Sequence, residues 1–247
     1  MSREAVYHAV ILKKQAYGDA DEIITFFTLE SGRVRGLAKS VKLSQSKLQN
    51  ALQGLFYVRV SLAHGSRSGA ASLKKIIRAE VLDTFMGLRA SLEAMKAGLF
   101  AAEAVYKATA DEHKNPKLFK VLLEFLRSLN AAALPAGSLP ALLAKFQISL
   151  LESLGFAVRV PALNEPGERG QAYFTVLGGG FTRAALEPDR VNVSAALLET
   201  FHTLHNADFI AASSADLKQA LELSRLLGGF LEYQLERQLH SRKLFLA

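Results

Sequence analysis

Residues 32–49, GRVRGLAKSVKLSQSKLQ, carry five cationic side chains and no acidic one. The cations are Arg33, Arg35, Lys39, Lys42 and Lys47. Lysine and arginine at this density can contact the phosphates of a nucleic acid, with an affinity that falls with salt and ignores base sequence. A solvated surface carries the same pattern, and this segment alone leaves both interpretations open.

The distribution of charge favours a polyanion. Residues 1–80 hold 13 Lys and Arg against 6 Asp and Glu, an excess of 7 that equals the net charge of the whole chain. Lys74, Lys75 and Arg78 add to this basic part, and we include Lys74 and Lys75 among the predicted phosphate contacts. A basic part joined to a neutral one indicates that the first meets a polyanion and the second has another task.

Two small clusters have the residue types of metal ligands. The first is Asp19, Asp21 and Glu22, and the second is Glu199, His202 and His205. A turn that enters a strand favours aspartate for its backbone geometry, and the histidines lack the HExxH spacing and an obvious third strong ligand. We therefore predict no metal and no cofactor.

The recognisable catalytic motifs are missing from the chain. The glycine-rich VLGGGFTR lacks the Lys-Ser/Thr of a phosphate-binding loop and is better explained as a hairpin turn. There is no G-x-S-x-G elbow and no cysteine, and the serines have no recognisable catalytic partner. We expect a protein that is not an enzyme, and the lack of cysteine suits a reducing cytoplasm.

Five segments of residues 1–80 have the composition of β-strands, and they must position the cations. Ser31-Gly32 forms a hairpin turn, and one long connection spans residues 39–54. Five strands in so short a chain fit a small closed barrel, because closure removes exposed sheet edges. Arg33 and Arg35 then point the same way, while one member of each aromatic pair, Phe26-Phe27 and Phe56-Tyr57, faces outward.

A helical pattern begins near residue 84. Asn115 and Pro116 predict one helix start, and Gly155 predicts the end of the next helix. Ser213 and Asp216 have capping-box spacing before the last long helix, in which Gly228-Gly229 predicts a bend. The apolar run at residues 5–12 is too short to span a membrane and ends at two lysines, so we expect neither anchor nor signal peptide.

Three stretches, in this order, carry a resemblance to a known family. They are AVILKKQAYGDADEIITFFTLESGRVRGLAKSVKLSQSKLQNALQGL, KFQISLLESLGF and LHSRKLF. In these stretches the protein resembles the RecO family of bacterial recombination mediators, and the resemblance extends along nearly the whole chain. The resemblance implies an α+β protein, with a five-stranded oligonucleotide-binding (OB) barrel at residues 1–80 and an all-helical domain at residues 81–247.

The resemblance also implies activities and partners. It implies binding of single- and double-stranded DNA, annealing of complementary strands, and binding of the acidic tail of single-stranded DNA-binding protein (SSB). It further implies action with RecR to load RecA in the bacterial cytoplasm, at the nucleoid. Arg33, Arg35, Lys39, Lys42 and Lys47 fall on the family's DNA-facing segment. Lys145, followed by Phe146, matches a position implicated in binding the tail.

The chain departs from the family pattern at two places. Ala38-Lys39-Ser40 replaces A-K-G, which argues against a turn with positive φ there. The insert at about residues 157–188 lacks the four cysteines of the family's zinc site. Without zinc its hairpin must be held by packing of Val158, Phe174, Val176 and Phe181, so we expect it to be either mobile or tightly docked on the helices.

A second function stays open beside DNA annealing. The barrel of a protein-interaction scaffold would bind an acidic partner, and that of an RNA-binding protein would bind RNA, without annealing activity. Acceleration of annealing between SSB-coated complementary strands distinguishes the two.

Overall fold

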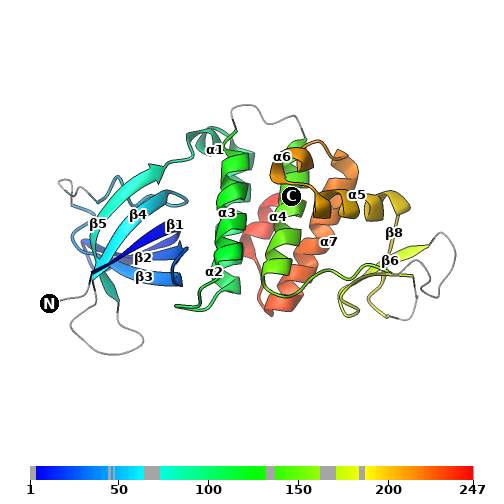
Figure 1. Ribbon diagram of the computed structural model, residues 1–247, viewed down its shortest axis with the longest axis horizontal. Helices are drawn as coiled ribbons and strands as arrows, with labels where there is room; N and C mark the ends of the chain where they lie inside the picture. The colour runs from blue at the N-terminus through cyan, green and yellow to red at the C-terminus, as the bar shows by residue number, and fades with distance from the viewer. Residues whose placement is uncertain are drawn as a thin grey trace.

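The computed structural model of the protein describes residues 4–43, 46, 48–63, 73–131, 137–161, 171–183 and 187–246. The molecule is elongated, with a β-barrel at one end, a bundle of helices in the middle and a small sheet at the other end (Figure 1). The predicted α+β class, a five-stranded barrel followed by helices, is confirmed.

Five strands close the barrel in the order β1-β2-β3-β5-β4. Their bounds are β1 Glu4–Tyr17, β2 Asp21–Thr28, β3 Gly32–Ala38, β4 Tyr57–Ala63 and β5 Lys74–Asp83. All neighbours are antiparallel except β3 and β5, which pair in parallel over two residues of each strand. The predicted hairpin turn lies between β2 and β3, and the predicted long connection joins β3 to β4.

The expectation of no left-handed turn after β3 was wrong. Ser40 has φ 53°, and its amide donates to Asp21 Oδ1 at 2.7 Å. A serine therefore occupies a conformation that glycine adopts most readily, with the Asp21 carboxylate bonded to its amide. Asp21, one of the residues considered as a metal ligand, accepts a hydrogen bond that stabilises this turn.

Helices follow the barrel. Their bounds are α1 Met86–Ala90, α2 Leu92–Ala108, α3 Pro116–Leu129, α4 Ser138–Ser153, α5 Ala195–Asn206, α6 Phe209–Ala212, α7 Leu217–Leu235, the 3₁₀ helix η1 His240–Arg242, and α8 Lys243–Leu246. Asn115 and Pro116 begin α3 as predicted, and Gly155, with φ 86°, follows the end of α4. Among the described residues, no helix is both long and apolar enough to cross a membrane.

The start of α7 differs from prediction, whereas the bend at Gly228-Gly229 stays a prediction. Asp216 is its N-cap and accepts from the Gln219 amide, whereas Ser213 ends α6, so the predicted capping box is absent. The helix also runs unbroken through Gly228 and Gly229. A Cβ on Gly228 would lie 2.8 Å from Arg242 Nε, so this glycine makes room for a side chain from the C-terminal segment.

The cysteine-free insert is docked on the helices. It forms a three-stranded sheet in the order β7-β6-β8, with bounds β6 Ala172–Thr175, β7 Gly180–Thr182 and β8 Val191–Val193. Phe174 packs edge-on against Phe230 of α7 at 6.0 Å between ring centroids, and Phe181 meets Phe201 of α5 at 5.1 Å. Aromatic packing thus holds the described part of this sheet, in line with the expectation that packing would hold an insert without cysteine.

The barrel and the helices share one hydrophobic core. Val10, Phe27 and Leu55 of the barrel part belong to the same buried cluster as the helices. Phe119 of α3 lies 6.1 Å from Phe27 and 6.3 Å from Tyr57, measured between ring centroids. Phe27 and Tyr57 thus face outward from the barrel, as predicted for one member of each pair, but they meet the helices.

Candidate nucleic-acid interface

The outer face of β3 carries a row of cations. Burial alternates along the strand, with Val34, Gly36 and Ala38 buried inside the barrel. Arg33 and Arg35 therefore lie on the other face, and both reach the same carboxylate, that of Asp111, as expected for alternate residues of a strand. The period of two thus places these two cations together.

The Arg33 side chain is bonded to residues of the helical part of the chain. Its Nε donates to Asp111 Oδ1 at 2.6 Å, and its Nη1 donates to the Tyr106 carbonyl at 2.6 Å. The guanidinium also lies over the Tyr106 ring, 5.0 Å from its centroid, and the side chain is only 17% exposed. Arg33 therefore acts as an interdomain contact in this arrangement rather than as an open phosphate ligand.

Arg35 is more accessible than Arg33. Its Nη2 lies 3.1 Å from Asp111 Oδ2, and 45% of its side chain is exposed. An exposed pair of this kind contributes about 0–1 kcal/mol, so a competing anion can displace the carboxylate at little cost.

The two predicted lysines of β5 have different environments. Lys74 is buried, donates from Nζ to Glu112 Oε1 at 2.7 Å, and lies 5.5 Å from the centroid of the Tyr7 ring. Burial acts to lower the pKa of Lys74, but the hydrogen bond from its ammonium to Glu112 and its interactions with the Tyr7 hydroxyl and the Glu112 charge together outweigh burial and hold the pKa above its ordinary value. Lys75 is exposed.

An open strip of cations remains on the barrel surface. Lys75 is the register partner of Leu37, which lies two residues after Arg35 on the outer face of β3, and Lys39 directly follows the end of that strand. We call Arg35, Lys39 and Lys75 the basic strip. Lys39 and Lys75 are exposed and form no ion pair with any residue that the structure describes. The strip therefore offers three cations to one elongated anion, from β3, from the turn that follows it and from the neighbouring strand β5.

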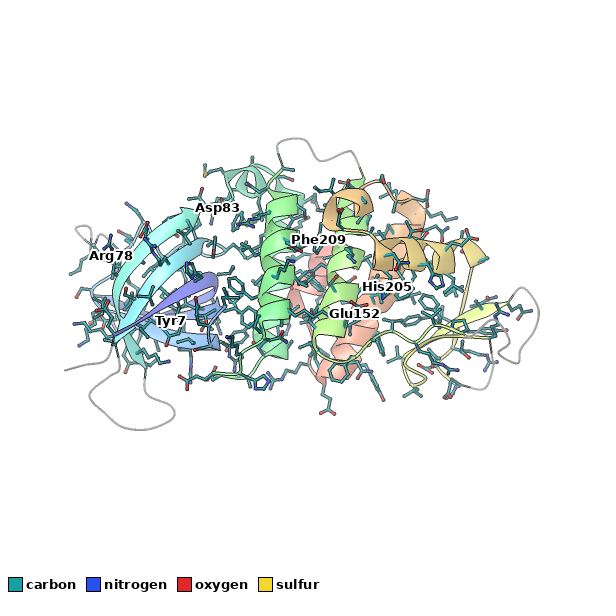
Figure 2. The ribbon with its side chains drawn as sticks, viewed as in Figure 1. Tyr7, Arg78, Asp83, Glu152, His205 and Phe209 are labelled. Carbon is teal, nitrogen blue, oxygen red and sulfur yellow. The ribbon has the colours of Figure 1, made fainter. Side chains whose placement is uncertain are left out.

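The remaining predicted cations of this segment follow the left-handed turn. Lys42 is exposed, and its backbone amide donates to the Ala20 carbonyl at 3.1 Å. Lys47 lies outside the described residues. Arg78 is exposed on β5, at the edge of the barrel in Figure 2.

The predicted aromatic pairs supply no open stacking surface. Phe26 is fully buried in the barrel, and Phe27 and Tyr57 pack beneath the helices. Phe56 is 8% exposed and has the Arg89 guanidinium over its ring at 4.7 Å. Contact with a nucleic acid at the strip would therefore rest on charge rather than on stacking through these rings.

Lys145 and Phe146, the predicted tail contacts, are both buried in α4. Lys145 donates to the His205 carbonyl at 2.9 Å and so satisfies the last turn of α5. Burial lowers the pKa of the Lys145 amine. Phe146 is 0% exposed and stacks on Phe125 with a centroid distance of 4.5 Å, so its ring offers no surface to a partner in this structure. A role for Lys145 in binding the tail stays a prediction.

The histidines of α5 are not arranged around a metal site. His205 Nε2 lies 2.6 Å from Glu152 of α4, and the two side chains meet between the helices in Figure 2. Among the described residues, no group of three or more His, Cys, Asp or Glu side chains has a geometry that would hold an ion. Glu22 likewise pairs with Lys14, at 3.3 Å.

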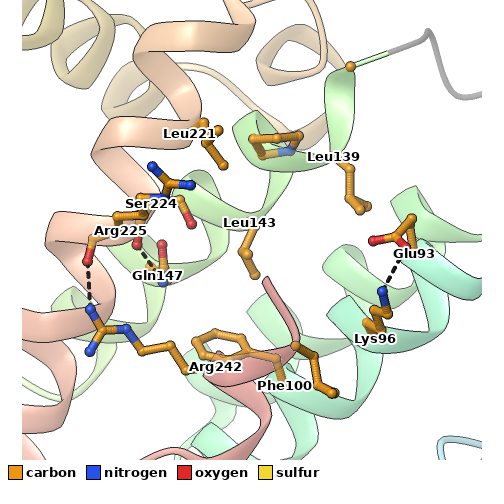
Figure 3. Close-up of a pocket in the computed structure, with 13 residues that line it drawn as sticks. Glu93, Lys96, Phe100, Leu139, Leu143, Gln147, Leu221, Ser224, Arg225 and Arg242 are labelled. Atoms are coloured by element: carbon orange, nitrogen blue, oxygen red, sulfur yellow. Dashed lines mark hydrogen bonds and ion pairs between the residues drawn. The ribbon is translucent and has the colours of Figure 1, made fainter. Parts of the chain in front are cut away.

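A pocket of about 450 Å³ lies between α2, α4, α7 and the C-terminal segment (Figure 3). Its polar groups largely bond one another. Gln147 donates to the Ser224 carbonyl at 3.1 Å, and Arg242 donates to the Arg225 carbonyl at 3.0 Å. The pocket is formed by the helical part of the chain, and none of the basic strip residues lines it.

Sequence reasoning missed the partners of the predicted cations, Asp111, Glu112 and Tyr106. It also missed Glu103 of α2, which accepts from the amides of His240 at 3.0 Å and Ser241 at 2.8 Å and from the Ser241 hydroxyl. The HSR of the C-terminal motif is thus anchored on α2. No local signal marks these acids, because their partners lie far away in the sequence.

Comparison with known proteins agrees with the resemblance seen in the sequence. The family model for the recombination protein O C terminal matches residues 89–243, and the model for its N terminal matches residues 1–85. A DNA repair protein RecO from Dehalococcoides mccartyi is 36% identical over 149 residues, which cover 60% of this chain and 55% of that protein.

Two further relatives align over nearly the whole chain. A DNA repair protein RecO from a Synechococcus species is 31% identical over 245 residues, covering 94% of this chain and 86% of its own length. One from an Anaeromyxobacter species is 26% identical, covering 95% of this chain and 92% of its own length. The chain thus aligns with about half of the first relative and most of the other two.

Proposed function

Because the chain belongs to the recombination protein O (RecO) family, we propose that it is a non-enzymatic DNA-binding protein of recombinational repair. It binds single- and double-stranded DNA through the barrel and anneals complementary strands. It recognises the acidic tail of SSB and acts with RecR to load RecA. Its place of action is the bacterial cytoplasm, at the nucleoid.

The observation that carries the proposal is the basic strip on a closed five-stranded barrel. Arg35 and Lys75 lie on the outer face of adjoining strands and Lys39 directly follows β3, and this arrangement suits an extended phosphate backbone. Barrels of this kind bind single strands in a positively charged groove. A protein that neutralises the phosphates of two strands lowers their mutual repulsion, which is the main electrostatic barrier to annealing.

Annealing of SSB-coated complementary strands tests the proposal. We expect the wild-type protein to accelerate duplex formation and the variant Arg35→Ala/Lys39→Ala/Lys75→Ala to lose most of this acceleration. The same variant should bind a single-stranded oligonucleotide more weakly, with a salt slope flatter by about 0.7 for each phosphate contact removed. Fluorescence polarisation across a series of salt concentrations measures the slope.

A matched control distinguishes the effect of the basic strip from the effect of lowering the net charge of the protein. Lys117→Ala/Lys120→Ala/Lys218→Ala removes three exposed lysines from the helical part and should leave annealing and the salt slope nearly unchanged. Wild-type protein that does not accelerate annealing at all would overturn the proposal. Binding to RNA or to an acidic protein without annealing would instead support a scaffold or an RNA-binding role.

A further inference from the structure

The loop between α2 and α3 lies along an edge of the barrel that the strands leave open. β5 pairs with β3 only from Gly36 onward, so the earlier part of β3 has a free edge on that side. Asp111 forms a β-bridge with Arg33 there, and the Glu112 amide donates to the Arg33 carbonyl at 2.8 Å. We call residues 109–115 the acidic loop.

The acidic loop presents its carboxylates to three of the seven predicted DNA contacts. Asp111 binds both Arg33 and Arg35, through different carboxylate oxygens, at 2.6 and 3.1 Å. Glu112 binds Lys74 at 2.7 Å. Two carboxylates held on adjacent residues thus occupy the positions at which phosphate oxygens would pair with these cations.

The backbone of the loop is held close to the barrel and is strained. A Cβ on Gly32 would lie 1.9 Å from the His113 carbonyl oxygen, so only glycine permits this approach. Glu112 is itself in the left-handed region, with φ 56°. Its side chain is nevertheless 59% exposed, which leaves the carboxylate at the solvent edge while the backbone stays fixed.

We propose that the acidic loop is an internal competitor for DNA, which neutralises Arg35 and Lys74 in the free protein. A bound strand displaces the two carboxylates, and the freed cations extend the basic strip toward the helical domain. The inference rests on the proposed DNA-binding function. A strand already held by Lys39 and Lys75 presents its phosphates to Arg35 at high effective concentration, which favours displacement of the Asp111 carboxylate.

Charge-neutral substitutions in the loop test the inference. Asp111→Asn and Glu112→Gln keep size and shape but remove the competing charge. We expect the double variant to bind a single-stranded oligonucleotide several-fold more tightly at low salt. Its salt slope should be steeper by about 0.7 for each cation that gains a phosphate.

A matched control removes two exposed acids elsewhere. Glu124→Gln/Glu199→Gln makes the same change in net charge on α3 and α5. Loop variants that behave like this control would overturn the inference. Absence of DNA binding in every protein, the wild type included, would instead overturn the proposed function. Glu112→Gln alone, which leaves the Arg33–Asp111 contact intact, keeps the test valid if Asp111→Asn disturbs folding.

Discussion

Ser40 decides how the chain leaves β3 and therefore where the next cations point. Its φ of 53° turns the chain between exposed Lys39 and exposed Lys42, and the Asp21 carboxylate accepts its amide. A left-handed residue other than glycine costs about 1–2 kcal/mol. The chain thus tolerates backbone strain at Ser40, the residue that directly follows Lys39 of the basic strip.

Replacing Ser40 by glycine should relieve this strain. The relief of about 1–2 kcal/mol exceeds the entropy of about 0.5–1 kcal/mol that glycine loses on folding. We expect Ser40→Gly to raise the free energy of unfolding by about 0.5–1 kcal/mol, as measured by denaturant titration. Ser214→Gly, in a turn without positive φ, should lower it. A loss of stability in Ser40→Gly would contradict the assigned turn.

At the scale of elements, Glu103 ties the C-terminal segment to α2. Burial alone raises the pKa of Glu103, but hydrogen bonds from Lys107, Ser241 and His240 outweigh it and lower the pKa to about 2. The folded pKa lies below the ordinary value of 4.5, so the carboxylate stabilises the fold above that pH. This contribution is lost as the pH falls from 4.5 toward 2.

Glu103→Gln should therefore flatten the acid limb of the stability profile. We expect a loss of about 1.5–3 kcal/mol at neutral pH, typical of hydrogen bonds to a charged group, and a smaller difference from wild type at low pH. Denaturant titrations at several pH values measure both. Glu93→Gln, on the same helix but with a largely exposed side chain, is the control. A constant difference between Glu103→Gln and wild type at every pH would show that titration of Glu103 plays no part.

Local patterns predicted most elements, and distant contacts account for what they missed. The strand that carries Arg33 and Arg35, the helix start at Asn115-Pro116 and the helix end at Gly155 depend on neighbouring residues, and each is present. Ser213 and Asp216 have the spacing of a capping box, but Ser213 ends the short helix α6 and Asp216 alone caps α7.

In the candidate site too, local patterns predicted some features, and contacts with distant residues determine the others. Period-two alternation correctly placed Arg33 and Arg35 on one face of a strand. Nothing local revealed that Asp111, 78 residues after Arg33, would occupy that face, or that Glu112 would bind Lys74. A predicted cation is therefore better supported as a ligand when its environment is known, as for exposed Lys39 and Lys75.

At the scale of the whole molecule, the junction between barrel and helices keeps the acidic loop in register with β3. Phe119 follows the loop by one turn of α3 and packs against Phe27 of β2 and Tyr57 of β4. The ring is 3% exposed, so its contacts belong to the shared core. The position of Asp111 over Arg33 thus depends on packing that crosses the two parts.

Phe119→Ala should weaken this coupling. Truncation of a buried phenylalanine costs about 3–5 kcal/mol, and here the cavity opens between the barrel and the helices. We expect a large drop in the free energy of unfolding and faster amide exchange at Glu112, whose bond to the Arg33 carbonyl crosses the junction. Hydrogen exchange and denaturant titration measure the two effects.

Phe156→Ala gives the comparison, because that ring is 38% exposed just after α4 and should cost far less. If the inference about the acidic loop holds, Phe119→Ala should also bind single-stranded DNA more tightly than Phe156→Ala at low salt, because a loosened junction holds the competing carboxylates less firmly. Equal DNA affinity in the two variants, with exchange at Glu112 accelerated only in Phe119→Ala, would show that the position of the loop does not control access to the basic strip.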